Sequence, residues 1–398
     1  MRADIFCRVV DNYGDIGVCW RLARRMACGH SWSIRLWVDD LRAFSRIQPG
    51  VMTDAVRQTF NGIEVVHWTP EPPALDPGDV VIEAFACDPP AAFVRAMQQQ
   101  LHSGQAQPPI WINLEYLSAE PWVESCHGLP SQRPDGLTKY FFFPGFTPAT
   151  GGLLHEPGLS TEREAFQASR DEQERFLRDL GLGEAVLGHW RAGARVVSLF
   201  CYPQAPLAAL VKALIDDARP TVLIVPEGVA PSLEQMVAVG EHVRVARVPF
   251  VPQPDFDRLL WCADLNFVRG EDSFVRAAWA ARPLVWQIYP QDENVHLEKL
   301  EAWLTRYPAP AEAHAAIRAW NTPLHSEDAA LGDFGVVPPT ADLNPRVSTT
   351  AAALSAALRS PVWTDWQDAA RAWDTAQAAR PDLGDSLAEF CAKLSKKR

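Results

Sequence analysis

The sequence predicts an α/β protein with two doubly wound, Rossmann-like domains. Short apolar runs rich in Val and Ile alternate with amphipathic stretches of helical spacing, which is typical of parallel strands covered by helices on both faces. This alternation stops near residues 150–185 and then begins again. A length of 398 residues also fits two domains. We therefore expect two domains of similar size that face each other across a cleft.

The first series defines an N-terminal domain at residues 1–155. It begins with DIFCRVV (4–10), an apolar run that predicts a buried strand, followed by a turn with glycine and an amphipathic stretch at 16–27. Further strands of this domain are predicted at 33–40, 63–68, 79–85 and 109–117. Strands separated by helices indicate βαβ units and a parallel sheet.

The second series defines a C-terminal domain at residues 185–354, after a polar helical linker at 156–184. Its strands are predicted at 195–202, 221–228, 243–251, 264–269 and 283–290. Its helices are predicted at 205–217, 255–263 and 273–281. The helical segment at 355–398 is expected to pack back on the first domain.

The charge balance argues against one class of partner. Lys and Arg total 37 and Asp and Glu total 49, a net charge of −12. Such a chain does not suit nucleic-acid binding through neutralised phosphates. An acidic surface suits a basic protein partner, although solubility alone also accounts for it.

The sequence also predicts no membrane segment and no metal site. No apolar run approaches the ~18–20 residues that span a bilayer, and the apolar start is too short for a signal peptide. We therefore expect a cytoplasmic protein.

The eight cysteines form no CxxC pair and have no zinc-ligand spacing, so they are expected to be buried, reduced thiols.

The first candidate site is the turn DNYGDIG (11–17), directly after the first strand. Ligands bind at such strand ends in doubly wound sheets, and Gly14 and Gly17 permit close backbone approach and unusual φ angles. The carboxylates of Asp11 and Asp15 would repel a pyrophosphate, so the expected ligand is neutral or cationic. Asp15 also has a structural explanation, as the N-cap of the helix that follows.

The second candidate site is RGEDS (269–273), again at a strand end that leads into a helix. Ser273 is placed as an N-cap, the helix start favours an anion, and Arg269 adds positive charge. The structural alternative is that Glu271 and Asp272 are acids of an ordinary first helical turn.

Two further loops carry candidate ligand contacts. Phe250 and Gln253 follow a strand, where a ring would stack on a base and the amide would pair with an imide edge. Tyr289 also stands at a strand end, within reach of a phosphate. The alternative is that both are ordinary connections rich in Pro.

Taken together, these segments resemble the bacterial protein-arginine rhamnosyltransferases that glycosylate translation elongation factor P. The matching segments are FCRVVDNYGDIGVCWRLARR, VVIEAFACDPP, WINLEYLSAEPW, KYFFFPGF, VPFVPQPDFDRLLW and NFVRGEDSFVRAAWAARPLVWQIYPQDENVH. The resemblance implies a GT-B glycosyltransferase whose first domain binds the acceptor and whose second binds the nucleotide sugar. It implies inverting transfer of L-rhamnose from dTDP-β-L-rhamnose to an arginine of elongation factor P, which activates that factor for rescue of stalled translation. No metal or cofactor is expected.

The resemblance also implies roles for individual residues. Asp15 would be the general base, Asp11 a positioning carboxylate, and Glu271 a carboxylate that stabilises the guanidinium or the sugar from the other domain. The expected donor contacts are Asn12, Tyr13, Gly14, Gly17, Phe200, Tyr202, Phe250, Gln253, Arg269, Asp272, Ser273 and Tyr289.

Two other functions stay open on the sequence. One is another GT-B enzyme, acting on a small molecule or lipid, or a nucleotide-sugar epimerase. The other is a binding module without catalysis for a basic translation protein. The carboxylates of the DNYGDIG turn favour a cationic acceptor. A dinucleotide-dependent oxidoreductase is disfavoured because no GxGxxG follows a predicted strand.

Overall fold

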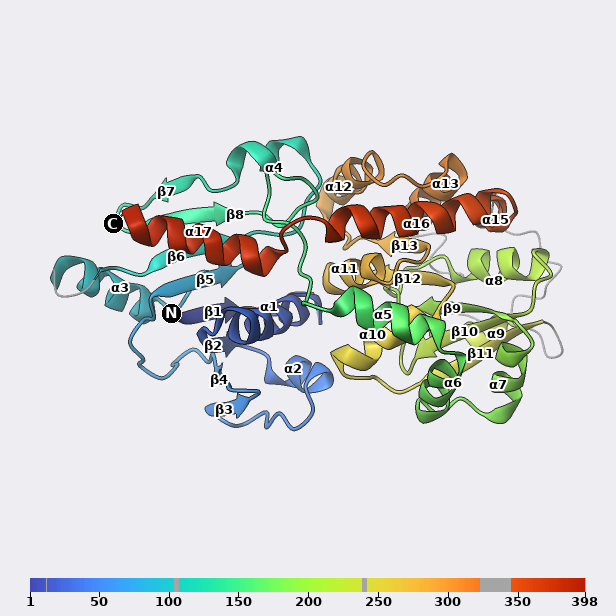
Figure 1. Ribbon diagram of the computed structural model, residues 1–398, viewed down its shortest axis with the longest axis horizontal. Coiled ribbons are helices and arrows are strands. Elements are labelled where there is room, and N and C mark those ends of the chain that lie inside the picture. Colours follow the sequence, from blue (N-terminus) through green and yellow to red (C-terminus); the bar gives the residue numbers. More distant parts are fainter. Residues whose placement is uncertain (12, 104–106, 238–241, 323–344, 398) are drawn as a thin grey trace. The chain divides into compact units, whose positions relative to one another are not determined.

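The computed structural model describes residues 1–11, 13–103, 107–237, 242–322 and 345–397, which divide into two compact units (Figure 1). Unit 1 comprises Met1–Leu159 and Ala376–Arg398, and unit 2 comprises Ser160–Thr375. Each unit is built on a mainly parallel sheet with helices. The predicted α/β class is therefore confirmed.

The sheet of unit 1 has the strand order β3-β4-β2-β1-β5-β6-β8-β7. Its strands are β1 (Arg2–Cys7), β2 (Ser33–Val38), β3 (Arg57–Phe60), β4 (Ile63–His67), β5 (Val80–Ala84), β6 (Ile110–Leu114), β7 (Pro130–Gln132) and β8 (Thr138–Phe142). β3 and β7 pair antiparallel with β4 and β8 at the two edges, and the inner pairs are parallel. The strand order changes direction between β1 and β5, and ligands bind at the carboxyl ends of strands at such a point.

Both faces of this sheet are covered, as the continuous apolar strands predict. Trp20 of α1 (Gly14–His30), Phe44 of α2 (Leu41–Ile47) and Leu387 of α17 (Leu383–Lys397) share one buried cluster with the strands. Phe93 and Met97 of α3 (Ala91–Ser103) belong to the cluster on the other face. A short helix, α4 (Pro121–Cys126), follows β6.

Ion pairs join α17 to α1 within unit 1. The guanidinium of Arg25 lies 2.6 Å from an oxygen of Asp382 and 2.6 Å from an oxygen of Asp385. Arg25 is buried, and Asp382 lies at the start of α17, where its other oxygen accepts the N–H of Gly384. These contacts fix the last helix against the first.

The sheet of unit 2 is parallel throughout, in the order β11-β10-β9-β12-β13. Its strands are β9 (Arg195–Leu199), β10 (Thr221–Pro226), β11 (Val243–Val248), β12 (Leu265–Arg269) and β13 (Leu284–Gln287). The strand order changes direction between β9 and β12. The carboxyl ends of these two strands therefore form the expected ligand position of unit 2.

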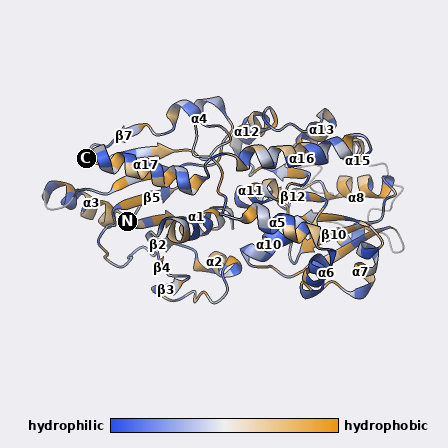
Figure 2. Cartoon of the chain, viewed as in Figure 1, coloured by the Kyte–Doolittle hydropathy of each residue, from blue (hydrophilic) through white to orange (hydrophobic). Residues whose placement is uncertain are grey.

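The helices of unit 2 include α8, which is apolar along most of its length (Figure 2). They are α5 (Leu159–Ala168), α6 (Arg170–Asp179), α7 (Glu184–Arg191), α8 (Leu207–Asp216), α9 (Leu233–Met236), α10 (Gln253–Cys262), α11 (Asp272–Trp279), η1 (Asp292–Asn294), α12 (Val295–Leu304), α13 (Ala311–Asn321), α15 (Pro345–Leu358) and α16 (Val362–Ala378). Among the described helices, none is long and apolar enough to cross a bilayer.

The domain limits differ from those expected from the sequence. Most of the segment 156–184, expected as a linker, forms α5 and α6 and is part of unit 2. The segment 355–398 was expected to pack as a whole on the first domain, but the division falls within α16. α15 packs against α8 and α13 of unit 2, because its apolar side chains, including Leu354, are buried there. Only the part from Ala376 onward, with α17, belongs to unit 1.

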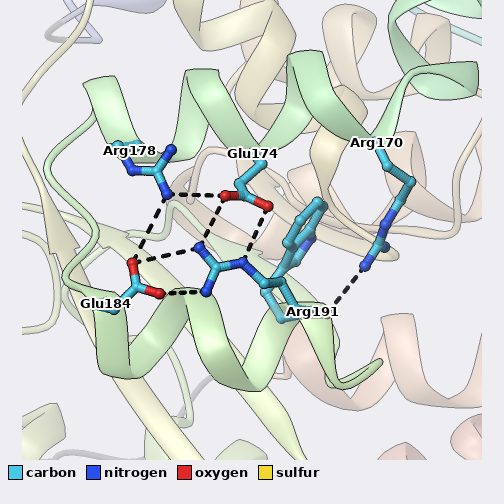
Figure 3. A network of polar contacts seen from close by, with 6 residues as sticks. Arg170, Glu174, Arg178, Glu184 and Arg191 are labelled. Carbon is cyan, nitrogen blue, oxygen red and sulfur yellow. Dashed lines mark hydrogen bonds and ion pairs between the residues drawn. The ribbon is translucent and has the colours of Figure 1, made fainter.

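A network of exposed ion pairs connects α6 to α7 (Figure 3). Glu174 lies 2.9 Å from Arg178 on its own helix and 2.9 Å from Arg191 of α7. The Arg191 and Arg178 guanidinium groups lower the pKa of Glu174 to about 2. Arg170 stacks on the ring of Trp190, with 3.8 Å from its Cζ to the ring centroid. The network lies on the surface, where such pairs contribute little to stability.

The cysteines are mostly buried, as predicted. None of the eight, all of which the structure describes, forms a disulfide. Cys28 is exposed and Cys126 is half-buried, so these two differ from the expectation.

Candidate functional site

The turn between β1 and α1 holds its carboxylates through backbone hydrogen bonds. Asp15 lies in the first turn of α1 and is only 3% exposed. Its Oδ2 accepts the N–H of Val10 at 2.8 Å and the N–H of Asp11 at 2.9 Å. The side chain therefore ties the turn that precedes the helix, and its orientation is fixed.

This arrangement corrects two expectations about the turn. The helix begins at Gly14, and the residue at the N-cap position is Tyr13, which makes no side-chain capping bond. Asp15 is therefore not an N-cap, because it lies inside the helix and bonds to N–H groups before it. Gly14 and Gly17 both belong to α1, so unusual φ angles are not their role.

The absence of a side chain at Gly14 leaves room for the Asp11 carboxylate. A Cβ atom on Gly14 would lie 2.9 Å from Oδ2 of Asp11. The Gly14 N–H also donates to the Asp11 carbonyl at 2.7 Å. The structure thus brings Asp11 and Asp15 together at the end of β1, whereas Asn12 lies outside the described residues.

The turn after β5 stands beside this site, because β5 pairs with β1. Phe85, Ala86 and Asp88 have φ angles of 58°, 53° and 49°. Such left-handed backbone costs about 1–3 kcal/mol for each residue other than glycine, and it gathers at functional positions. The ring of Phe85 stacks on that of Tyr116, with 4.4 Å between the centroids.

The RGEDS turn of unit 2 connects β12 to α11. Glu271 occupies the N-cap position of α11 without a side-chain capping bond, and its Oε1 lies 3.0 Å from Nζ of Lys299. Ser273, expected as the N-cap, lies instead in the first turn of the helix. Its hydroxyl accepts the N–H of Arg269 at 3.2 Å and donates to the carbonyl of the same residue. The serine therefore locks the strand end to the helix start.

An aromatic cluster surrounds the Arg269 guanidinium at the same edge of the sheet. Its Cζ lies 4.5 Å from the ring centroid of Phe200 and 4.7 Å from that of Tyr202. The ring of Phe200 lies edge to face with that of Phe250, with 6.1 Å between the ring centroids, and the ring of Tyr202 lies edge to face with that of Tyr289, with 5.7 Å between the centroids. The residues come from the ends of β9, β11, β12 and β13, so the structure brings five predicted donor contacts together.

Two more predicted contacts lie at helix starts in unit 2. Gln253 is the first residue of α10 and is 3% exposed. Asp272 is the first residue of α11 and is half-buried. Tyr289 is 42% exposed, so it is the most accessible of the cluster.

Two residues near these sites were missed by the sequence interpretation. Lys299 lies on α12, 28 positions after its partner Glu271, and no local pattern indicates such a pairing. Asp39 follows β2 directly, and its Oδ1 accepts the N–H of Val9 at 2.9 Å. Its place at a strand end next to β1 was the available signal.

The chemistry of the two sites differs. The carboxylates in unit 1 suit a guanidinium, which binds such groups through charge-assisted hydrogen bonds. The aromatic rings, Arg269 and the start of α11 in unit 2 suit a nucleotide with a diphosphate. Across the described residues, no group of three or more His, Cys, Asp or Glu side chains is arranged to hold a metal ion.

Comparisons with known proteins show the family of this chain. Residues 3–392 match the family described as Elongation-Factor P (EF-P) rhamnosyltransferase EarP. A protein-arginine rhamnosyltransferase from Pseudomonas putida is 46% identical over 404 residues, covering 97% of this chain and 97% of that protein. A solved structure from work on EarP-mediated arginine glycosylation of translation elongation factor EF-P is 32% identical, with a TM-score of 0.60. The match covers 98% of this chain and 99% of that one.

A more distant structure shares the fold alone. A UDP-glucosyltransferase from Polygonum tinctorium has a TM-score of 0.54 at 10% identity, over 98% of each chain. These two structures confirm the GT-B fold class. The family match and the Pseudomonas putida relative confirm the assignment as a glycosyltransferase. Because the family match spans almost the whole sequence, this chain belongs to the EarP family of protein-arginine rhamnosyltransferases.

Proposed function

We propose that this chain transfers L-rhamnose from dTDP-β-L-rhamnose to an arginine of EF-P, in the cytoplasm and with inversion at the anomeric carbon. The observation that carries the proposal is the match of residues 3–392 to the EarP family. The modified EF-P is then active in the rescue of stalled translation. The side chains described above supply the chemistry within each unit.

The acceptor problem is one of nucleophilicity. A guanidinium has a pKa above ~12 and shares its lone pairs over three nitrogens, so it attacks poorly unless it loses a proton as the bond forms. The Asp15 carboxylate takes that proton as general base. Because two N–H groups hold its Oδ2, the carboxylate is oriented before the substrate binds. Asp11 positions the cationic group.

The reaction exchanges one bond at the sugar for another. An arginine nitrogen forms a bond to C1 of rhamnose while the bond from C1 to the diphosphate oxygen breaks. The electron pair of that bond leaves with dTDP, and the proton from nitrogen goes to Asp15. Attack from the face opposite the leaving group inverts the anomeric carbon, so the β donor gives an α-linked product.

The donor is held by unit 2. Phe250 and Gln253 bind the thymine, because a ring stacks on the base and the amide offers both a donor and an acceptor. Arg269 and the start of α11 compensate the charge of the diphosphate as it leaves. Glu271 opposes the positive charge that builds on the sugar. No metal or cofactor is required by this scheme.

The proposal is tested by incubating EF-P with the chain and dTDP-β-L-rhamnose. Peptide mass spectrometry should show one added deoxyhexose on one arginine, and NMR of the product should show an α linkage. An unmodified EF-P, a β linkage, or sugar on another residue type would contradict it. The control reaction replaces the donor with UDP-glucose.

Two variants test the residue roles. Asp15→Asn should lower turnover by about 10²- to 10⁴-fold, the range for a general base, while dTDP affinity is unchanged. Gln253→Ala should weaken dTDP binding more than it lowers kcat. If Asp15→Asn turns over at the wild-type rate, Asp15 is not the base.

A further inference from the structure

The β1–α1 turn is held from a neighbouring strand as well as from its own helix. β1 and β2 pair in parallel, with Cys7 opposite Val38, so the segments that follow the two strands leave the sheet side by side. Asp39, the first residue after β2, accepts the N–H of Val9 at 2.9 Å. The contact joins residues 30 positions apart in the sequence.

Three successive backbone N–H groups of the turn thus donate hydrogen bonds to carboxylates. Val9 donates to Asp39, and Val10 and Asp11 donate to Asp15. Packing supports the turn only on one side, because Val9 contacts the core whereas Val10 is 63% exposed. Hydrogen bonds to the two aspartates therefore set the path of the backbone that carries Asp11.

The adjacent residue, Asp40, forms an ordinary helix N-cap, in contrast to Asp39. Asp40 is the N-cap of α2, and its Oδ1 accepts the N–H groups of Arg42 and Ala43 at 2.9 and 3.0 Å. Asp39 accepts neither of these two bonds, so the N-cap of α2 does not depend on it. The two neighbouring aspartates serve different elements.

We propose that Asp39 is a positioning residue for rhamnosyl transfer, which holds the β1–α1 turn so that Asp11 and Asp15 meet the acceptor guanidinium. The inference rests on the proposed function of those two carboxylates. Asp39 acts through the Val9 N–H and touches no substrate. Its required property is an acceptor oxygen at this point, and its charge is secondary.

The test compares Asp39→Ala, Asp39→Asn and the matched control Asp40→Ala in the full chain. Amide hydrogen exchange of residues 9–11, thermal unfolding, dTDP affinity, and kcat and KM for EF-P are measured for each. Asp39→Ala should speed exchange in the turn and lower kcat/KM for EF-P by about 10- to 100-fold, the cost of misplacing a reacting group by about 1 Å. Its dTDP affinity should equal that of the wild type.

The other two variants test whether Asp39 acts through its acceptor oxygen or its charge, and whether a loss of stability alone would lower activity. Asp39→Asn keeps the acceptor oxygen and should recover most of the lost activity and exchange protection. Asp40→Ala should lower Tm by about 2–4 °C through its lost cap, with kcat/KM within about twofold of wild type.

Three results would overturn the inference: unchanged exchange at residues 9–11 in Asp39→Ala, unchanged kcat/KM in that variant, or equal damage from Asp39→Asn. The exchange measurement does not depend on turnover. Failure of the proposed function would appear separately, as a wild-type chain that transfers no rhamnose to EF-P.

Discussion

Replacing Arg25 with Met should destabilise unit 1 selectively. The change removes a buried guanidinium that binds Asp382 and Asp385 at 2.6 Å each. Met keeps much of the apolar volume of the Arg side chain. The loss of stability therefore reflects the missing ion pairs more than a change in packing. The affected ion pairs are among the contacts that hold α17 against α1.

The expected loss can be worked out from the burial of each partner. Breaking a buried ion pair by removing one partner costs about 3–5 kcal/mol. The side chain of Asp385 is 51% exposed, so its share is at most about 1 kcal/mol. The side chain of Asp382 is 10% exposed but keeps the N–H of Gly384 at 2.6 Å, which places the total near the lower limit, about 3 kcal/mol. For a unit of this size, the loss corresponds to a fall in Tm of about 6–12 °C.

Differential scanning calorimetry of the full chain measures this loss. The transition of unit 1 should move down while that of unit 2 stays in place. Arg178→Met, which removes an exposed member of the α6–α7 network, is the control and should move neither transition by more than about 2 °C. Adding Asp382→Leu to Arg25→Met should recover part of the loss, because no buried carboxylate is left behind. A loss below about 1 kcal/mol, or a shift confined to unit 2, would refute the reasoning.

Three other predictions concern the buried His296, the Glu271–Lys299 ion pair and the need for a metal. Burial lowers the pKa of His296 from its ordinary 6.5, and its Nδ1 accepts the Gln291 N–H. Since the folded pKa lies below the unfolded one, this stabilisation is complete above pH 6.5 and is lost as pH falls through the lowered value. The unfolding temperature of His296→Asn should therefore fall less between pH 7.5 and pH 5.5 than that of the wild type, and equal slopes would contradict this. Lys299→Met should lower kcat by about 10-fold by releasing Glu271, and Lys299→Arg should restore it; identical kcat values would show that the ion pair has no part in turnover. Treatment with EDTA should leave the rate of transfer unchanged, and a rate restored only by added Mg²⁺ would contradict the metal-free scheme.

Much of the fold was predictable because the strands are short, apolar and bounded by turn residues. The strand expected at 195–202 is β9, and the helix expected at 205–217 is α8, each with shifted ends. The edge strands β3 and β7 were not predicted, because they are brief and their few residues lack a continuous apolar run.

The candidate site was predictable only in part. The DNYGDIG and RGEDS turns stand at strand ends, which a sequence reveals, and both do so in the structure. The direction of each side chain was not predictable. Asp15 turns back to Val10, and Ser273 bonds to Arg269 instead of capping its helix. Such contacts depend on where the helix begins, and an error of one or two residues changes the partner.

The contribution of α17 to unit 1 has a consequence for synthesis of the protein. Leu383, Leu387 and Cys391 are buried in the same core as Ile5 of the first strand. A nascent chain therefore lacks one part of that core until α17 has left the ribosome, whereas unit 2 is continuous, ends at Thr375 and can fold earlier. The carboxylates of the β1–α1 turn are built on a unit whose core includes α17, so the turn reaches its final packing only after α17 has been synthesised.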